Sequence, residues 1–143
     1  MKCYIASPFF DKEGNDEIEE VKDVLKSFSI DFFSPKDSTI VNEKSSLFER
    51  KKAFLTDIEE LNNCDFMIAN TRNKDMGTLI EIGIFYEKGK PILLYCPSLK
   101  GKVFNLMLAQ IFKGLAFDKN ELIMMLDNFI TGNLEQEYLG DIE

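Results

Sequence analysis

Short apolar runs alternate along this chain with longer segments whose apolar residues recur at helical spacing. Apolar runs typical of buried strands cover Cys3 to Ser7, Asp31 to Ser34, Asp65 to Ala69 and Pro91 to Cys96. Helical spacing marks Asp16 to Phe28, Leu47 to Leu61, Gly77 to Lys88, Phe104 to Ile111 and Lys119 to Phe129. Strands that are apolar throughout belong to parallel sheets covered on both faces. The alternation therefore predicts one α/β domain over residues 1–143, an open parallel sheet of about five strands of the Rossmann or flavodoxin type with helices on both faces.

Polar segments follow the carboxyl ends of the predicted strands, where open parallel sheets bind ligands. The segments that meet at this edge are Ser7 to Phe10, Pro35 onward within the loop 36–46, Asn70 onward within the loop 70–76, and Pro97 onward. Lys90 belongs to the opposite end of the sheet and is a poor candidate ligand. Residues 131–143 are polar and acidic and are expected to form a C-terminal tail.

Composition narrows the classes of function. The 143 residues carry a net charge of −8, which argues against nucleic acid and anionic membrane surfaces as partners. No apolar stretch approaches a membrane span, and the chain enters a strand pattern without a signal peptide, so a cytoplasmic location is expected. The absence of histidine excludes His-based nucleophile arrangements and His-based metal sites. Gly77 and Gly83 form no GxGxxG motif, so no dinucleotide or other cofactor is expected.

The three cysteines lie far apart in or beside apolar runs. They are Cys3, Cys64 and Cys96, and no CxxC spacing occurs. We expect them to be buried, reduced thiols.

One carboxylate, Glu81, interrupts an otherwise apolar helical segment. A buried carboxylate without partners costs several kcal/mol, so Glu81 either faces water or lines a cleft that uses its charge. Asp75 lies six residues earlier, at the expected start of the same helix. Two carboxylates at one helix mouth can perform acid–base or nucleophilic chemistry.

Several motifs resemble those of the nucleoside 2-deoxyribosyltransferase family. Tyr4-Ile-Ala-Ser-Pro-Phe-Phe10 and Phe33-Ser-Pro35 resemble its first two strands and their loops. Asp75-x-Gly-Thr-x-x-Glu81-x-Gly83, followed by Gly89-Lys-Pro91, is similar to its catalytic helix and next strand. Phe54-x-x-Asp57 and Asn105-Leu-Met107 resemble two further elements, and the order is kept from residue 4 to residue 107.

The resemblance implies transfer of a 2'-deoxyribosyl group between nucleobases with retained configuration, through a covalent sugar–enzyme intermediate. It implies Glu81 as nucleophile, Tyr4 as the residue that orients it, and Asp75 and Asp57 as groups that hold the base and sugar hydroxyls. Asn105 and Met107 belong to a substrate-binding element, and Phe9 and Phe10 can stack on the base. The expected partners are 2'-deoxyribonucleosides and free purine or pyrimidine bases.

The same resemblance predicts a homo-oligomer, a dimer or a trimer of dimers. In this family the element that corresponds to Asn105 comes from a neighbouring subunit, so that active sites are shared. Leu106, Met107 and Phe104 flank Asn105 and could anchor such a contact.

Two other functions fit the sequence. A 2'-deoxynucleoside 5'-monophosphate N-glycosidase would use water in place of the second base and would need a phosphate pocket, with Ser7 and Ser98 as hydroxyls and Lys36 or Lys100 as charge. A non-catalytic nucleotide-binding domain would keep the fold without the chemistry, which the presence of both Glu81 and Asp75 disfavours.

Overall fold

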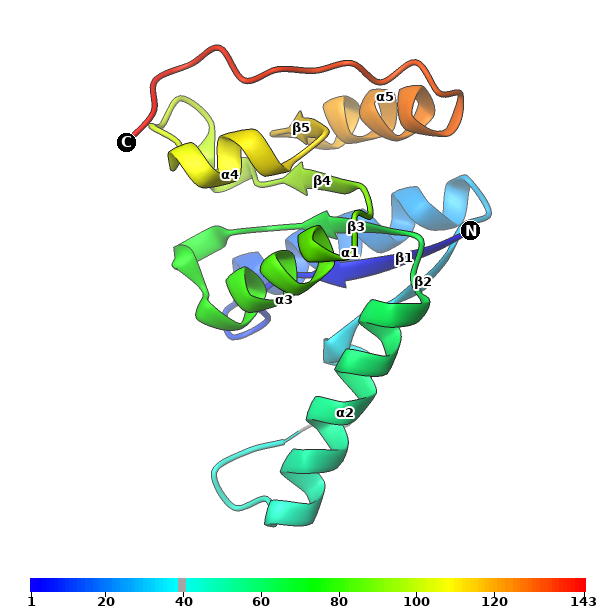
Figure 1. Cartoon of the computed structure of the whole chain (residues 1–143), viewed down its shortest axis with the longest axis vertical. Coiled ribbons are helices and arrows are strands. Elements are labelled where there is room, and N and C mark those ends of the chain that lie inside the picture. Colours follow the sequence, from blue (N-terminus) through cyan, green and yellow to red (C-terminus); the bar gives the residue numbers. More distant parts are fainter. Residues whose placement is uncertain (39–40) are drawn as a thin grey trace.

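The computed structural model describes residues 1–38 and 41–143, and residues 39 and 40 of the predicted loop 36–46 lie outside the described residues. Five parallel strands form one sheet in the order β2-β1-β3-β4-β5 (Figure 1). The strands are β1 (Lys2–Ala6), β2 (Asp31–Phe33), β3 (Phe66–Ala69), β4 (Ile92–Tyr95) and β5 (Gly114–Ala116). The helices are α1 (Lys12–Ser27), α2 (Leu47–Asn63), α3 (Met76–Glu87), α4 (Leu106–Ile111) and α5 (Lys119–Ile130). This strand order is the flavodoxin-like one and confirms the predicted fold class.

The two faces of the sheet carry separate apolar cores. Cys3 and Ile5 of β1 point to the face covered by α1 and α5, whereas Tyr4 and Ala6 point to the face covered by α2, α3 and α4. This division follows from the period of two along a strand. It places Tyr4 beneath α3. All three cysteines are buried and unbridged, as predicted.

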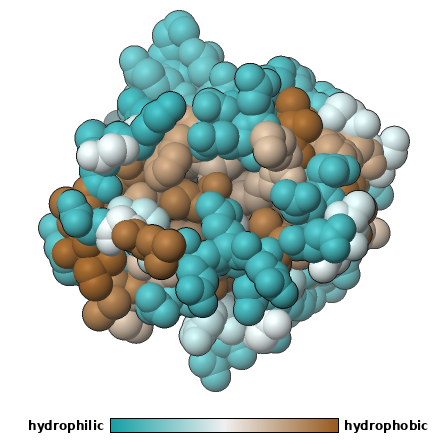
Figure 2. Space-filling model, turned by 90° about the horizontal axis from the view of Figure 1, so that it is seen from above, coloured by the Kyte–Doolittle hydropathy of each residue, from teal (hydrophilic) through white to brown (hydrophobic). Residues whose placement is uncertain are grey.

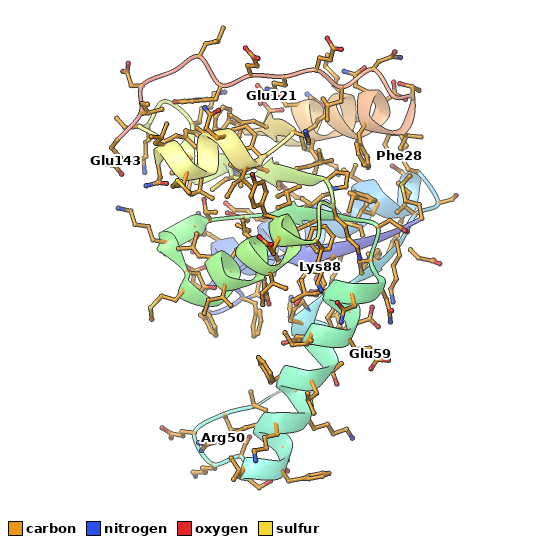
Figure 3. All side chains as sticks on the ribbon, in the orientation of Figure 1. Phe28, Arg50, Glu59, Lys88, Glu121 and Glu143 are labelled. Carbon is orange, nitrogen blue, oxygen red and sulfur yellow. The ribbon has the colours of Figure 1, made fainter. Side chains whose placement is uncertain are left out.

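Helix α2 extends beyond the sheet as an arm (Figure 1), and Figure 3 shows Arg50 near its far end. The sequence predicted one apolar face from Leu47 through Phe54 to Ile58 and Leu61. Only the end of that face is covered, because Leu61 is buried and Ile58 is half-buried, while Leu47 is 66% and Phe54 60% exposed. The outer half of α2 therefore presents apolar side chains that no described residue of this chain covers.

Two other segments differ from the prediction. The apolar runs in the sequence locate only four strands. The structure adds a fifth, β5, a short strand whose three residues include a glycine. The tail 131–143, predicted only as a polar and acidic segment, packs against the rest of the chain. The Gln136 side chain accepts a hydrogen bond from the Leu115 amide and donates one to the Leu115 carbonyl, so it satisfies the open edge of β5. Further along the tail, Ile142 pairs with Phe104 in a parallel β-bridge.

The predicted helix boundaries hold within a few residues. Helix α1 begins at Lys12 rather than Asp16, because the Asp11 side chain accepts a hydrogen bond from the Gly14 amide and caps the helix. Gly89 follows the end of α3 with φ of 69°, as its predicted capping role requires. Lys90 lies at the opposite end of the sheet, where its Nζ donates to backbone carbonyls at the end of α2.

Candidate active site

The centre of the candidate site is a hydrogen bond between Tyr4 and Glu81. The Tyr4 hydroxyl donates to Oε1 of Glu81 across 2.9 Å, and this bond joins β1 to α3. The Tyr4 ring is fully buried and packs against Phe33, with ring centroids 5.4 Å apart. A buried tyrosine has few alternative rotamers, so its hydroxyl fixes the position of the Glu81 carboxylate.

Two of the carboxyl groups around Tyr4, those of Glu81 and Asp57, have raised pKa values. Burial raises the pKa of Glu81, the hydrogen bond from Tyr4 lowers it and the charges of Asp57 and Asp75 raise it, and the net result is a pKa of about 8. Burial also raises the pKa of Asp57 to about 6. Carboxyl groups with raised pKa values in one place are typical of catalytic sites. The structure therefore brings Tyr4, Glu81, Asp57 and Asp75 into one electrostatic neighbourhood.

Asp75 has a structural task as well as a place near Glu81. It is the N-cap of α3, and its Oδ2 accepts hydrogen bonds from the amide of Thr78 at 2.9 Å and from the Thr78 hydroxyl at 2.8 Å. Oδ1 makes no hydrogen bond in this structure to a described residue and is available to a substrate. Thr78 is buried, and although it belongs to the Asp75-x-Gly-Thr motif, it is not among the predicted site residues.

Asn105 and Met107 lie on the other side of α3 from Glu81. They line an apolar pocket of about 360 Å³ between α3 and α4, to which α3 contributes Leu79, Ile82 and Gly83. Successive helix residues are about 100° apart, which turns Glu81 from this pocket toward Tyr4 and α2. Asn105 caps α4, with Oδ1 accepting from the Met107 amide at 2.9 Å. Within one chain, Asn105 does not join the Tyr4–Glu81 centre.

The surface around Asn105 is apolar and accessible. Met107 is 69% exposed, and Leu106 and Val103 are each about half exposed. Figure 2 shows apolar surface gathered on the side where α4, the start of α3 and the end of the chain lie, and Figure 3 places Glu143 beside the start of α4. Phe104, by contrast, is buried.

Phe9 and Phe10 have different surroundings. Phe9 is partly buried against the core under α1 and α5, the face opposite to Glu81, and its predicted stacking role loses support for that reason. Phe10 is 78% exposed and its ring lies 5.0 Å from that of Phe9. Phe10 is therefore the better candidate for contact with a base.

Among residues 1–38 and 41–143, no group of three or more acidic, cysteine or histidine side chains is arranged to hold a metal ion. Nor does this part of the chain contain a helix long and apolar enough to cross a membrane.

The fold and site define a flavodoxin-like α/β protein in which a tyrosine orients a glutamate of α3, with two further carboxylates nearby, Asp57 on α2 and Asp75 at the start of α3. A family model described as nucleoside 2-deoxyribosyltransferase matches residues 3–126, and the chain belongs to this family. The predicted resemblance is thereby confirmed, and the match leaves out the end of α5 and the tail 131–143.

Solved structures of similar proteins support the family assignment and the fold. A 2-deoxyribosyltransferase from Bacillus psychrosaccharolyticus is 30% identical, with a TM-score of 0.83 over 97% of this chain and 100% of that chain. A CMP N-glycosidase from Clostridium botulinum is 19% identical, with a TM-score of 0.60 over 90% of this chain and 99% of that one. A conserved protein from Enterococcus faecalis V583 is 21% identical, with a TM-score of 0.57 over 100% and 81%. The last two likenesses concern the fold alone. The comparison with curated proteins gives no match.

The raised pKa of Glu81 predicts a pH-dependent stability. The unfolded chain ionises Glu81 near its ordinary pKa of 4.5, whereas the folded chain does so near 8. The folded state thus binds more protons between these values, and stability falls as pH rises through that window. In Glu81→Gln, the loss of unfolding free energy between pH 4.5 and 8.5 is expected to be smaller by about 2–4 kcal/mol. Urea unfolding of both chains at the two pH values measures the difference, and equal losses would contradict it.

Proposed function

We propose that this protein transfers the 2'-deoxyribosyl group between nucleobases by a retaining double displacement. In the first step a Glu81 oxygen bonds to C1' as the bond from C1' to the base nitrogen breaks, and the departing base takes a proton. In the second step the nitrogen of another base bonds to C1', the Glu81 carboxylate leaves, and the incoming base loses its proton. Two inversions give the retained configuration.

The observation that carries this proposal is the hydrogen bond from Tyr4 to Glu81. In its ionised form the Glu81 carboxylate, held in one rotamer in a largely buried site, is suited to attack C1' and to stabilise an oxocarbenium-like transition state. Because the pKa of Glu81 is about 8, the population of that form increases as pH rises through this value. Attack at C1' requires that the Glu81 carboxylate lie beside C2'. A 2'-hydroxyl would crowd or hydrogen-bond that carboxylate, so 2'-deoxyribonucleosides are the expected donors.

The neighbouring carboxylates supply the proton chemistry. The pKa of Asp57 is raised to about 6, which lets this group share a proton with a departing base near neutral pH. Asp75, with one oxygen committed to Thr78, is placed to accept a hydrogen bond from a base or a sugar hydroxyl.

The charge distribution favours nucleosides over 5'-monophosphates. Of the cations considered for a phosphate pocket, Lys36 is paired with Glu19 at 3.3 Å, and Lys100 is exposed on the turn after β4. The Ser7 and Ser98 hydroxyls have local partners, the Pro8 carbonyl and the Cys96 thiol respectively. In their ionised forms, the carboxyl groups around Tyr4 repel an anionic substrate. A 5'-monophosphate N-glycosidase is therefore the weaker proposal.

One mixture tests the proposal against its alternatives. We expect deoxyinosine and adenine to give deoxyadenosine and hypoxanthine, measured by chromatography. Free hypoxanthine and deoxyribose without deoxyadenosine would indicate a hydrolase. No reaction would indicate a non-catalytic domain or a 5'-monophosphate N-glycosidase, and release of hypoxanthine from deoxyinosine 5'-monophosphate would identify the latter. Inosine in place of deoxyinosine is the matched control, and comparable turnover of the two would contradict the proposed sugar specificity.

Tyr4→Phe tests the orienting hydrogen bond. The variant keeps the buried ring and loses only the hydroxyl, so folding and substrate binding are expected to persist. The transfer rate is expected to fall by about 10- to 100-fold, because a hydrogen bond to a charged group contributes about 1.5–3 kcal/mol. Steady-state kinetics with deoxyinosine and adenine measure kcat and KM separately, and an unchanged kcat would show that the Tyr4 hydroxyl does not orient Glu81.

We also propose that the protein is a homo-oligomer with shared sites. Two observations support this. The outer half of α2 and the surface around Asn105 expose apolar side chains, and Asn105 lies on the side of α3 that faces away from Glu81 in the same chain.

A further inference from the structure

We propose that Arg72 is a positioning residue that ties the loop after β1 to the loop after β3. The strand order reverses between β1 and β3, so the loops 7–11 and 70–75 flank the crevice where open α/β sheets bind ligands. One loop carries Phe10 and the other ends at Asp75. The inference rests on the proposed function, because it assigns Arg72 its effect through these two residues.

Arg72 is anchored on a buried acid of α1. Its Nη1 donates to Oε1 of Glu17 at 3.1 Å, and the Asn70 side chain donates to Oε2 of Glu17 at 2.7 Å. The Arg72 amide in turn donates to the Asn70 side-chain oxygen at 3.0 Å. Glu17 and Asn70 are 9% and 3% exposed. Charge-assisted hydrogen bonds to a buried carboxylate are stronger than surface ion pairs, so they fix the first half of the loop 70–75.

The same guanidinium faces the loop after β1. Its Nε lies 3.7 Å from Oδ2 of Asp11, and that Nε is buried without a hydrogen-bond partner among the described residues. Asn73 donates to the same Asp11 oxygen at 3.3 Å, while the other Asp11 oxygen caps α1. A closer approach of roughly 0.5–1 Å would complete the bond between Nε and Asp11. A buried donor is costly to leave unsatisfied, which favours that approach when the two loops close on a substrate.

The loop that Arg72 holds is conformationally strained just before Asp75. Asn73 and Lys74 have φ values of 58° and 52°, in the left-handed region that non-glycine residues rarely adopt. Such a conformation persists only where the surroundings enforce it. The bonds from Arg72 to Glu17 and toward Asp11 provide that enforcement, and they set the position of Asp75 relative to Phe10.

A double-mutant cycle tests whether Arg72 acts through Asp75. Transfer from deoxyinosine to adenine is measured for the wild type, Arg72→Met, Asp75→Asn and the double variant. Arg72→Met is expected to lower kcat/KM about 10- to 100-fold, since small displacements of positioned groups have effects of that size. In the Asp75→Asn background the further loss is expected to stay below about threefold. Equal losses in both backgrounds would overturn the proposal.

Two controls separate positioning from folding. Lys12→Met removes an exposed cation of α1 whose partner is Asp16, and activity is expected to stay within about twofold of wild type. Asp11→Asn keeps an N-cap for α1 and removes the charge that faces Arg72, and a smaller loss in the same direction as Arg72→Met is expected. Full activity in Asp11→Asn would overturn the bridge between the loops.

Amide hydrogen exchange gives a readout that does not depend on activity. In Arg72→Met, exchange is expected to accelerate in residues 7–15 and in residues 70–78 and to stay unchanged in α5. Acceleration confined to one of the two loops would overturn the bridge. If the wild type shows no transfer, the proposed function is refuted. The exchange experiment still tests whether Arg72 ties the loop after β1 to the loop after β3.

Discussion

Replacement of Glu81 by glutamine is expected to abolish transfer, with a loss of about 10⁴-fold or more in kcat, because an amide cannot form the sugar–enzyme bond. Glutamine keeps the shape of the side chain and can still accept the hydrogen bond that the Tyr4 hydroxyl donates to Glu81 across 2.9 Å. The fold is therefore expected to persist, and the variant is expected to gain stability at high pH for the reason given above. Loss of activity together with gained stability distinguishes a catalytic from a structural glutamate.

A matched variant and a covalent label make this test specific. Glu87 belongs to the same helix but is exposed, so Glu87→Gln is expected to keep full activity. Incubation of the wild type with a 2-fluoro-2-deoxyribosyl donor is expected to add one sugar mass to the peptide that carries Glu81. Peptide mass spectrometry reads the site of labelling. A label on Asp75 or Asp57 would reassign the nucleophile.

The Tyr4–Glu81 pair shows which parts of such a site a sequence can predict. A lone carboxylate in an apolar helix, and a tyrosine in an apolar strand, stand out because their polar groups need partners once they are buried. Parallel topology then brings β1 under α3, and the observed hydrogen bond follows. The fold was predictable for the same reason, since uninterrupted apolar strands and helical periodicity are local signals.

The features that the sequence did not predict depend on contacts between residues that are far apart in the sequence. Glu17 is one of several acidic residues in α1, and only the fold shows that it is the one that binds Asn70 and Arg72. The tail was likewise predicted as a polar segment, because the pairing of Gln136 with the backbone of β5 has no local pattern. Strand β5 has only three residues, and two of them, Gly114 and Ala116, have small or no side chains. No periodic pattern of apolar residues can reveal so short a strand.

Mixing two inactive variants is expected to restore activity if Asn105 serves the site of a neighbouring chain. Asn105→Ala is expected to be nearly inactive, because it loses the amide that we propose contacts the sugar or base. Loss of the α4 cap alone costs only about 1 kcal/mol of stability. Asn105→Asp, which retains an N-cap, controls for that cap. In a mixed dimer of Glu81→Ala and Asn105→Ala, one of the two sites combines an intact Glu81 with an intact Asn105.

The amount of rescue follows from symmetry. With free subunit exchange, about half of the dimers are mixed and each has one complete site, so activity is expected to recover to about a quarter of the wild-type value. Light scattering establishes the oligomer, and mass spectrometry of differently labelled chains establishes exchange. Rescue is expected because the two residues do not meet within one chain. Asn105 faces the pocket between α3 and α4, whereas Glu81 faces Tyr4. Exchange without rescue would place Asn105 in the site of its own chain or outside any site, and a fully active monomer would refute the shared site altogether.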